Sequence, residues 1–506
     1  MCAHLHADRS VKRDRDFMQP SAGLQIASQI DRDAYDVSLY HEMWHGSFTG
    51  PAPAADIVFL TGLQKDFDRQ RQLAYLFKRQ GAVTVAGGSV CTLFPDFAKE
   101  FFDVVCAGGV DSVRDVLADF ESGTLRRVYS SPQVRLTDYP VDYRLLDENG
   151  IRPSAHLVEA SRGCNFKCDF CALPAEGARH TKFGVSRVMK MIDASIDASP
   201  RRSLRRAYPT VWFIDNNFAN ERAYARELCA QLRANKRVKA WGALVTQDVL
   251  KNHDLVSEMA RSKCQLLFTG IESLDPAFLQ SHRKRQNVKH ASSLFEDVTF
   301  AKRAGITVIY GYLFDPRMST TADMAAQVQT LADIDALTFP SFFSFVAPLL
   351  GTPLFWESAD RGELRPNLRL RDLEGQSIAY RDCLDPDDEL SRFANTLFKR
   401  TDTLVSGRRL VAKSLAAGWD ARRGHPLQHV LTLYTNLRVL RNMRRRSQDV
   451  VRSYLGGTEI LDPQYRSYPS DIAPEDKSRW FDPIMVTDAQ SRPAEWLERY
   501  RPAVAA

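Results

Sequence analysis

Three closely spaced cysteines constrain this chain more than any other feature of its sequence. Cys164, Cys168 and Cys171 lie in the run Glu-Ala-Ser-Arg-Gly-Cys-Asn-Phe-Lys-Cys-Asp-Phe-Cys-Ala-Leu-Pro, which spans residues 159–174. A C-x3-C-x2-C spacing allows three thiolates from one loop to bind one iron-sulfur cluster, with one iron left for a ligand that is not protein. No second Cys or His pair lies close enough in the sequence to complete a tetrahedral zinc site. The spacing therefore favours an iron-sulfur site over a zinc knuckle or three incidental thiols.

An aromatic residue, Phe170, stands directly before the last of these cysteines. With the three cysteines it resembles the signature of the radical S-adenosylmethionine (SAM) superfamily. The resemblance implies a [4Fe-4S] cluster on Cys164, Cys168 and Cys171, with SAM chelated by the open iron and Phe170 beside it. It also implies that an electron from the cluster cleaves SAM to a 5'-deoxyadenosyl radical. In such enzymes the cofactors carry the difficult chemistry, and the protein holds and shields them.

Strand-like and helix-like segments alternate between Ser154 and Trp356. Short apolar runs, typical of buried parallel strands, cover residues 155–159, 210–215, 239–243, 265–269, 307–311 and 341–345. This rhythm predicts an α/β fold with a parallel sheet, and six strands suit the partial (β/α)6 barrel of the radical SAM family. We therefore assign residues 151–360 to a radical SAM core, with its chemistry at the carboxyl ends of the strands.

Three strand ends supply candidate SAM-binding residues. Asp215 ends the second strand, where relatives carry an Asp-rich turn facing SAM; a simple turn or helix cap is the alternative. Glu272 lies in a Gly-Ile-Glu-Ser segment that resembles one common in the cobalamin-dependent radical SAM subfamily. A carboxylate at that depth needs a donor, which SAM could provide. Gly311 ends a strand resembling the one that lies against the adenine, although the loop after it is altered.

The first 150 residues have the rhythm of a doubly wound parallel sheet. Apolar runs cover residues 35–40, 56–61, 82–86 and 103–108, with a helix-like segment at 67–79. Gly87, Gly88 and Ser89 follow one predicted strand, at the edge where such sheets bind ligands. Before a radical SAM core, this layout resembles the cobalamin-binding domain of the same subfamily. The resemblance implies cobalamin close to Gly87, Gly88 and Ser89.

Two features of residues 1–150 depart from that subfamily. Residues 1–16 are polar and charged where the domain normally opens with an apolar strand, so we expect the first strand to be missing. No Asp-x-His-x-x-Gly segment offers a histidine to cobalt, and the spacing of His41 and His45 favours ordinary loop residues. Two explanations stay open: the start site of the chain is misplaced, or the domain is degenerate and has lost its corrin.

Helical periodicity dominates residues 361–506. Helices are predicted at 387–401 and 427–454, as a cap over the barrel mouth, followed by an irregular tail from Trp480. The second helix is basic and amphipathic, which suits peripheral contact with anionic lipid or an acidic substrate; a solvated face is the simpler alternative. Its basic residues are Arg438, Arg441, Arg444, Arg445 and Arg446.

Composition limits the cellular setting and the partners. The six cysteines outside the triad follow no pairing motif, which indicates reduced packing residues. They are Cys2, Cys91, Cys106, Cys229, Cys264 and Cys383. The chain opens without a secretory signal and has no apolar run near the roughly 18 residues of a membrane span, so we expect a cytoplasmic protein. A net charge of +6 over 506 residues predicts no nucleic-acid partner.

The resemblance implies an enzyme that abstracts hydrogen from an unactivated carbon, with methylation as the commonest outcome in the subfamily. Residues 17–25 and the apolar barrel strands resemble members that act on hopanoids, other lipids and pigments. An electron donor such as flavodoxin or ferredoxin is implied as well. Two alternatives stay open: radical cyclisation, rearrangement or desaturation without methyl transfer, and a non-catalytic partner protein whose cluster is structural or redox-sensing.

Overall fold

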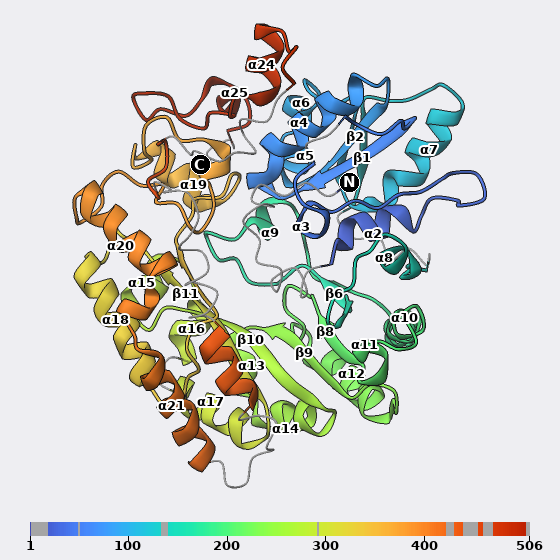
Figure 1. The fold of residues 1–506 in the computed structure, drawn as a ribbon. Coiled ribbons are helices and arrows are strands. Elements are labelled where there is room, and N and C mark those ends of the chain that lie inside the picture. The colour runs from blue at the N-terminus through green and yellow to red at the C-terminus, as the bar shows by residue number, and fades with distance from the viewer. Residues whose placement is uncertain are drawn as a thin grey trace.

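The computed structural model describes residues 1, 19–48, 51–132, 140–290, 293–420, 430–438, 454–458 and 469–501. Two parallel sheets, each covered by helices, organise this part of the chain (Figure 1). None of the described helices combines the length and the apolar character that crossing a bilayer requires.

The first sheet has four parallel strands whose spatial order follows the chain. They are β1 (Ile57–Gly62), β2 (Val83–Gly88), β3 (Val104–Gly108) and β4 (Val128–Ser131). The main connecting helices are α4 (Phe67–Lys78), α5 (Ser89–Leu93), α6 (Pro95–Ala98) and α7 (Val113–Glu121). Alternate strand residues belong to two apolar clusters, one shared with α4 and α6 and the other with α7, so helices cover both faces. The strands predicted at 56–61, 82–86 and 103–108 and the helix at 67–79 are confirmed.

The strand predicted at residues 35–40 is wrong. This segment has no regular secondary structure and pairs with no strand, and Leu39 is its one buried residue. The Leu39 N–H donates to Asn149 Oδ1 at 2.9 Å, a side chain after α8 (Arg144–Glu148), instead of to a sheet. Strand β4 was not predicted, because its run is short and half polar. The polar opening, and with it the predicted loss of a first strand, lies outside the described residues.

The second sheet has six parallel strands that curl into a half-barrel (Figure 1). Its spatial order is β12-β11-β10-β9-β8-β5, so each strand pairs with the next one along the chain in this sheet. The strands are β5 (His156–Val158), β8 (Thr210–Phe213), β9 (Ala240–Val245), β10 (Cys264–Glu272), β11 (Thr307–Phe314) and β12 (Phe342–Phe345). All six predicted strands and the partial barrel are thereby confirmed.

Amphipathic helices cover the outside of the half-barrel and turn their apolar stripes to the sheet. They are α10 (Val185–Asp197), α12 (Arg222–Ala234), α14 (His253–Arg261), α17 (Leu294–Arg303) and α18 (Thr321–Asp333). Shorter helices follow the carboxyl ends of the strands. These are α9 (Ala172–Ala175), α13 (Gln247–Leu250), α15 (Pro276–Ser281), α16 (Arg285–His290) and α19 (Pro353–Asp360), whereas α11 (Leu204–Ala207) precedes β8.

The C-terminal region divides between the two sheets. Helix α20 (Asp387–Lys399) confirms the prediction at 387–401, and α21 (Gly407–Asp420) was not predicted. Residues 430–438 are helical, whereas the rest of the predicted basic helix, with Arg441 and Arg444 to Arg446, lies outside the described residues.

The predicted tail from Trp480 is largely irregular, with one short helix, α25 (Glu495–Glu498), and it packs against the helices of the first sheet. It starts at the end of α24 (Pro474–Phe481), which lies close to α4 (Figure 1). The buried Arg71 guanidinium donates to the carbonyls of Arg479 and Asp482 at 2.5 and 2.6 Å. The Trp496 ring stacks on Phe97 with centroids 4.0 Å apart. These contacts join residues far apart in sequence, so local periodicity could not reveal them.

Candidate active site

The three cysteines lie in the loop that connects the two strands of a small hairpin. Strand β6 (Ser161–Arg162) pairs antiparallel with β7 (Thr181–Lys182), and the cysteines and α9 occupy the connection. Gly163 has φ +75°, and a Cβ there would lie 2.4 Å from the Arg179 carbonyl oxygen, so the loop can start only at a glycine. The Cys171 N–H donates to the Cys168 carbonyl at 3.2 Å, and this turn keeps the two cysteines close together.

Asp215 supports the base of this loop. One carboxylate oxygen accepts from the Ala160 N–H at 2.9 Å and the other from the Ser161 hydroxyl at 2.6 Å. Asn216 Oδ1 accepts from the Gly163 N–H at 2.9 Å. Asp215 is fully buried, and that burial raises the pKa of its carboxyl to about 7. Both oxygens are therefore occupied by the chain itself, which favours a turn-stabilising role over direct contact with SAM.

The thiols have the surroundings that an anionic cluster needs. Cys168 is buried, and Gln286 Nε2 lies 3.6 Å from its Sγ; Asn217 Nδ2 lies 4.0 Å from Cys164 Sγ. Burial raises the pKa of the Cys171 thiol to about 11 in the metal-free protein, so binding iron must displace protons. Amide donors to sulfur are among the groups that tune iron-sulfur clusters.

Among the described residues, no three His, Cys, Asp or Glu side chains are grouped to hold one metal ion. A cubane places each cysteine on its own iron, and three thiolates from one loop are a donor set that such a cluster uses.

Sequence reasoning missed the cation beside these thiols. Lys284 is buried, its Nζ forms an ion pair with Glu272 Oε1, and it lies 5.6 Å from the centroid of the Phe170 ring. Burial opposes its charge, but Glu272 and the Cys168 thiol outweigh that effect and raise the pKa of Lys284. The structure thus brings the predicted residues Phe170 and Glu272 together, with Lys284 between them. The only sequence signal was its position shortly after the Gly-Ile-Glu-Ser segment.

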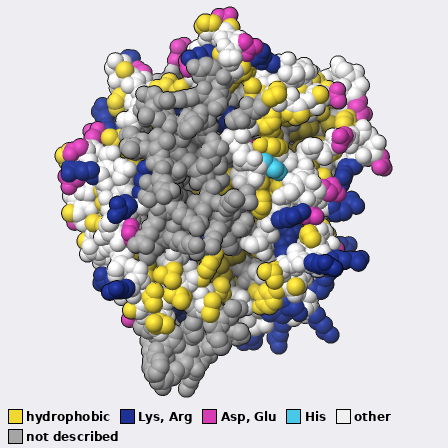
Figure 2. Space-filling view, in the orientation of Figure 1, with side chains coloured by type: hydrophobic (Ala, Val, Ile, Leu, Met, Phe, Trp, Pro, Cys, Tyr) yellow, Lys and Arg dark blue, Asp and Glu magenta, His cyan; other side chains and the backbone are white. Residues whose placement is uncertain are grey.

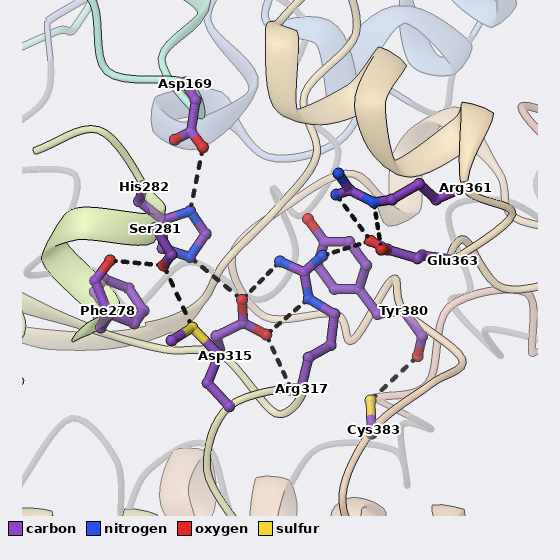
Figure 3. A network of polar contacts seen from close by, with 11 residues as sticks. Asp169, Phe278, Ser281, His282, Asp315, Arg317, Arg361, Glu363, Tyr380 and Cys383 are labelled. Carbon is purple, nitrogen blue, oxygen red and sulfur yellow. Dashed lines mark hydrogen bonds and ion pairs between the residues drawn. The ribbon is translucent and has the colours of Figure 1, made fainter.

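A buried polar network ties the cysteine loop to the barrel (Figure 3). His282 lies between two carboxylates: Nδ1 is 3.5 Å from Asp169 Oδ2, and Nε2 is 3.3 Å from Asp315 Oδ2. Arg317 pairs with Asp315 at 2.6 Å and stacks 3.7 Å from the Tyr380 ring centroid. Burial lowers the pKa of His282, yet both carboxylates outweigh it and raise the pKa, so the imidazolium is favoured.

Gly311 lies beneath an aromatic ring on the half-barrel sheet. A Cβ at this position would lie 2.3 Å from the Phe342 ring, which itself stacks on Phe268 with centroids 5.8 Å apart. Gly242 is covered in the same way by Trp212. The absence of a side chain at Gly311 is therefore explained by ring packing, and its predicted contact with adenine stays a prediction.

The glycine turn of the first sheet faces the cysteine loop. Gly88 has φ +109°, and a Cβ there would lie 2.4 Å from the Gly62 carbonyl oxygen, so the close approach of β1 requires glycine. Gly87 and Gly88 line a cavity of about 40 Å³ at the carboxyl ends of the strands. The Ser89 hydroxyl donates to Glu176 just after α9, at 2.5 Å. The predicted cobalamin residues thus lie at the ligand-binding edge of the sheet, next to the cysteine loop.

The remaining predicted residues have structural roles. His41 is buried and accepts from the Met43 N–H at the start of α3 (Glu42–His45), and His45 Nε2 contacts the Asn149 carbonyl at 2.8 Å. Both histidines are therefore used within the fold. Eight cysteines are described and all are free. Cys91, Cys106, Cys229 and Cys264 are buried, as expected of packing residues, and their reduced state stays a prediction; Cys2 lies outside the described residues.

No protein-family model matches the chain. Its sequence is similar to the bacteriochlorophyllide d C-12(1)-methyltransferase of Chlorobaculum tepidum, with 26% identity over 363 residues, covering 70% of this chain and 76% of that protein. Its fold is similar to that of OxsB, a cobalamin-dependent S-adenosylmethionine radical enzyme with aqua-cobalamin and SAM bound. The TM-score is 0.58 at 14% identity, covering 90% of this chain and 77% of that one. It also resembles the radical SAM methyltransferase TsrM of Kitasatospora setae, with cobalamin and a [4Fe-4S] cluster bound. Here the TM-score is 0.54 at 14% identity, covering 85% and 97% of the two chains.

Proposed function

Because the chain belongs to the cobalamin-dependent group of radical SAM enzymes, we propose that it transfers a methyl group to an unactivated carbon of a small pigment-like molecule. The observation that carries this proposal is the cysteine loop, which places Cys164, Cys168 and Cys171 beside the buried Lys284 and its partner Glu272. The pigment is suggested by the bacteriochlorophyllide substrates named for two sequence relatives.

In this proposal the three thiolates would hold a [4Fe-4S] cluster, which would supply the electron for the reductive cleavage of SAM. Gln286 and Asn217 donate to the sulfurs. Glu272, paired with Lys284, offers a carboxylate that can accept a hydrogen bond from SAM, and the Phe170 ring lies 5.6 Å from Lys284 Nζ. Asp215 acts indirectly, because it fixes the loop.

We propose that Gly87, Gly88 and Ser89 contact cobalamin. Their position at the carboxyl edge of a parallel sheet supports the assignment. The cobalamin named for both structural neighbours supports it as well. With two cofactors placed on two sheets, we propose three domains: residues 1–150 for cobalamin, 151–360 for the cluster and SAM, and 361–506 as the C-terminal part.

Two further features belong to the proposal. The cluster must be reduced by one electron, so we expect a donor such as flavodoxin or ferredoxin. Free buried cysteines and oxygen-sensitive chemistry suit the reducing cytoplasm. Peripheral membrane contact through the predicted basic helix involves mainly residues outside the described ranges.

Radical cyclisation, rearrangement or desaturation without methyl transfer is the alternative reaction. One fold can host several reactions, so the fold does not decide between them. The sequence relatives, which are named as methyltransferases, favour methyl transfer over this alternative and over a non-catalytic partner protein.

Anaerobic reconstitution with iron, sulfide and hydroxocobalamin tests the proposal. With SAM labelled in its methyl group, dithionite and bacteriochlorophyllide d, we expect 5'-deoxyadenosine, S-adenosylhomocysteine and a labelled pigment. Formation of 5'-deoxyadenosine without label transfer to any pigment would move the assignment to the alternative reaction. A cluster that never cleaves SAM would contradict enzymatic function.

A further inference from the structure

A surface pocket of about 600 Å³ lies directly beside the cysteine loop. Its walls come from the loop itself and from three segments that follow barrel strands: the start of α13, the end of α15 and α16. Functional residues of parallel barrels gather at this end of the strands. The volume lies within the range of small-molecule sites in proteins, about 300–1,000 Å³. The lining residues are Phe166, Asp248, Gln280, Arg285, Gln286, Val288 and Lys289.

One side chain joins this pocket to the proposed cluster. Gln286 lines the pocket, and its Nε2 lies 3.6 Å from the Sγ of Cys168. Phe166 also lines the pocket, and it lies between Cys164 and Cys168 in the sequence. A molecule in the pocket is therefore separated from the site of radical formation by about one side chain. A reactive radical must meet its substrate before it meets water, which favours such proximity.

The charges of the pocket select an anion. Arg285 and Lys289 lie one helical turn apart on α16, and both are exposed. Within the described ranges, neither forms an ion pair with a carboxylate. The acidic wall residue, Asp248, is neutralised by Arg222. Two unpaired cations above apolar walls suit a molecule with an apolar body and one carboxylate.

A second basic region does not have these properties. Lys and Arg side chains also gather over α11 and α12, on the outer helices of the barrel (Figure 2). Arg206 and Arg237 of this region are paired with Asp197. Arg285 and Lys289 thus differ from this basic region in their position beside the cysteine loop, and not in the number of charges.

We propose that the pocket binds the substrate through a carboxylate, which Arg285 and Lys289 hold, while Phe166 and Val288 contact its apolar body. This inference rests on the proposed function, since it assigns a substrate class to the same site. Bacteriochlorophyllide d is a suitable probe because it is a planar apolar ring system that carries a free propionate. Its propionate methyl ester has the same rings without the charge.

Fluorescence titration of the reconstituted protein with these two pigments tests the inference. We expect the wild-type protein to bind the acid at least tenfold more tightly than the ester. In the double variant Arg285→Gln, Lys289→Gln, affinity for the acid should fall at least tenfold, while affinity for the ester should not change. Arg283→Gln is the matched control, because Arg283 lies between α15 and α16 but pairs with Glu357 outside the pocket.

Three results would overturn the inference. Equal affinity of the wild-type protein for acid and ester would show that the carboxylate does not contribute to binding. An unchanged affinity for the acid in the double variant would show that Arg285 and Lys289 do not hold the carboxylate. Wild-type protein that cleaves SAM but binds neither pigment would refute the pocket assignment and leave the radical chemistry intact. Wild-type protein that does not cleave SAM would instead contradict the proposed function.

Discussion

His282 Nδ1 lies 3.5 Å from the carboxylate of Asp169, the residue between Cys168 and Phe170. Because His282 follows α15 and also contacts Asp315 after β11, this pair fastens the middle of the cysteine loop to the barrel. Asp215 fastens the beginning of the same loop through Ala160 and Ser161. The loop is therefore held at two points before any cluster binds. Such preorganisation limits the entropy that cluster binding must overcome.

Replacing His282 should destabilise the protein without touching a cysteine. In His282→Ala the buried carboxylates of Asp169 and Asp315 lose their common partner, and a broken buried pair typically costs about 3–5 kcal/mol. Arg317 still neutralises Asp315, so we expect about 3 kcal/mol. Urea unfolding at pH 6 measures this loss. His253→Gln is the control, because its partly exposed pair with Asp297 should contribute less than about 1 kcal/mol. Equal losses in both variants would contradict the fastening role.

The Cys168→Ala variant should lose the cluster and with it all 5'-deoxyadenosine formation. Two thiolates do not hold a site-differentiated cubane, whereas the fold around the loop rests on other contacts. Iron content and the nucleoside product are measured after anaerobic reconstitution. Cys229→Ala, a buried free cysteine on α12, serves as the control and should keep both. Retained SAM cleavage in Cys168→Ala would refute the cluster assignment.

The parts of this site that could be predicted from the sequence are those whose contacts are local in the chain. The cysteines and the six barrel strands are local patterns, so they could be predicted. Lys284, Gln286 and His282 lie in the connection after β10, and only the folding of α15 and α16 brings them to the cysteine loop. Asp215 was assigned to SAM because its position in the strand is visible in the sequence. The direction of its carboxylate toward Ala160 and Ser161 depends on tertiary structure.

Asp215 should also give the protein a measurable pH dependence. Burial raises the pKa of its carboxyl to about 7, well above the unfolded value near 3.9. The folded state therefore keeps a proton that the unfolded state has lost between these values, so stability falls as the pH rises from about 4 to 7. The upper limit of this loss is about 4 kcal/mol. Comparing unfolding free energies of wild-type and Asp215→Asn protein over this range isolates the effect. Parallel pH curves for the two proteins would show that Asp215 does not titrate in this way.

Glu272→Gln should weaken SAM binding without removing iron. The substitution removes the charge that pairs with Lys284 but keeps the size of the side chain. We expect about a tenfold loss of SAM affinity, since a charge-assisted hydrogen bond is replaced by a neutral one. Equilibrium dialysis with SAM on reconstituted protein measures the affinity, and iron content reports the cluster. Unchanged affinity would leave the Glu272 and Lys284 pair with a purely structural role.

Gly311→Ala tests whether the glycine serves ring packing. Its Cβ would lie 2.3 Å from the Phe342 ring, so the ring must move, and such overpacking costs about 1–3 kcal/mol. In the double variant Gly311→Ala, Phe342→Leu, the smaller side chain should restore most of the loss, which a double-mutant cycle of unfolding free energies measures. Gly184→Ala, where a Cβ would meet nothing within 4 Å, is the control. If Phe342→Leu restores nothing while SAM affinity falls in Gly311→Ala, the missing side chain is required by the adenine and not by the ring.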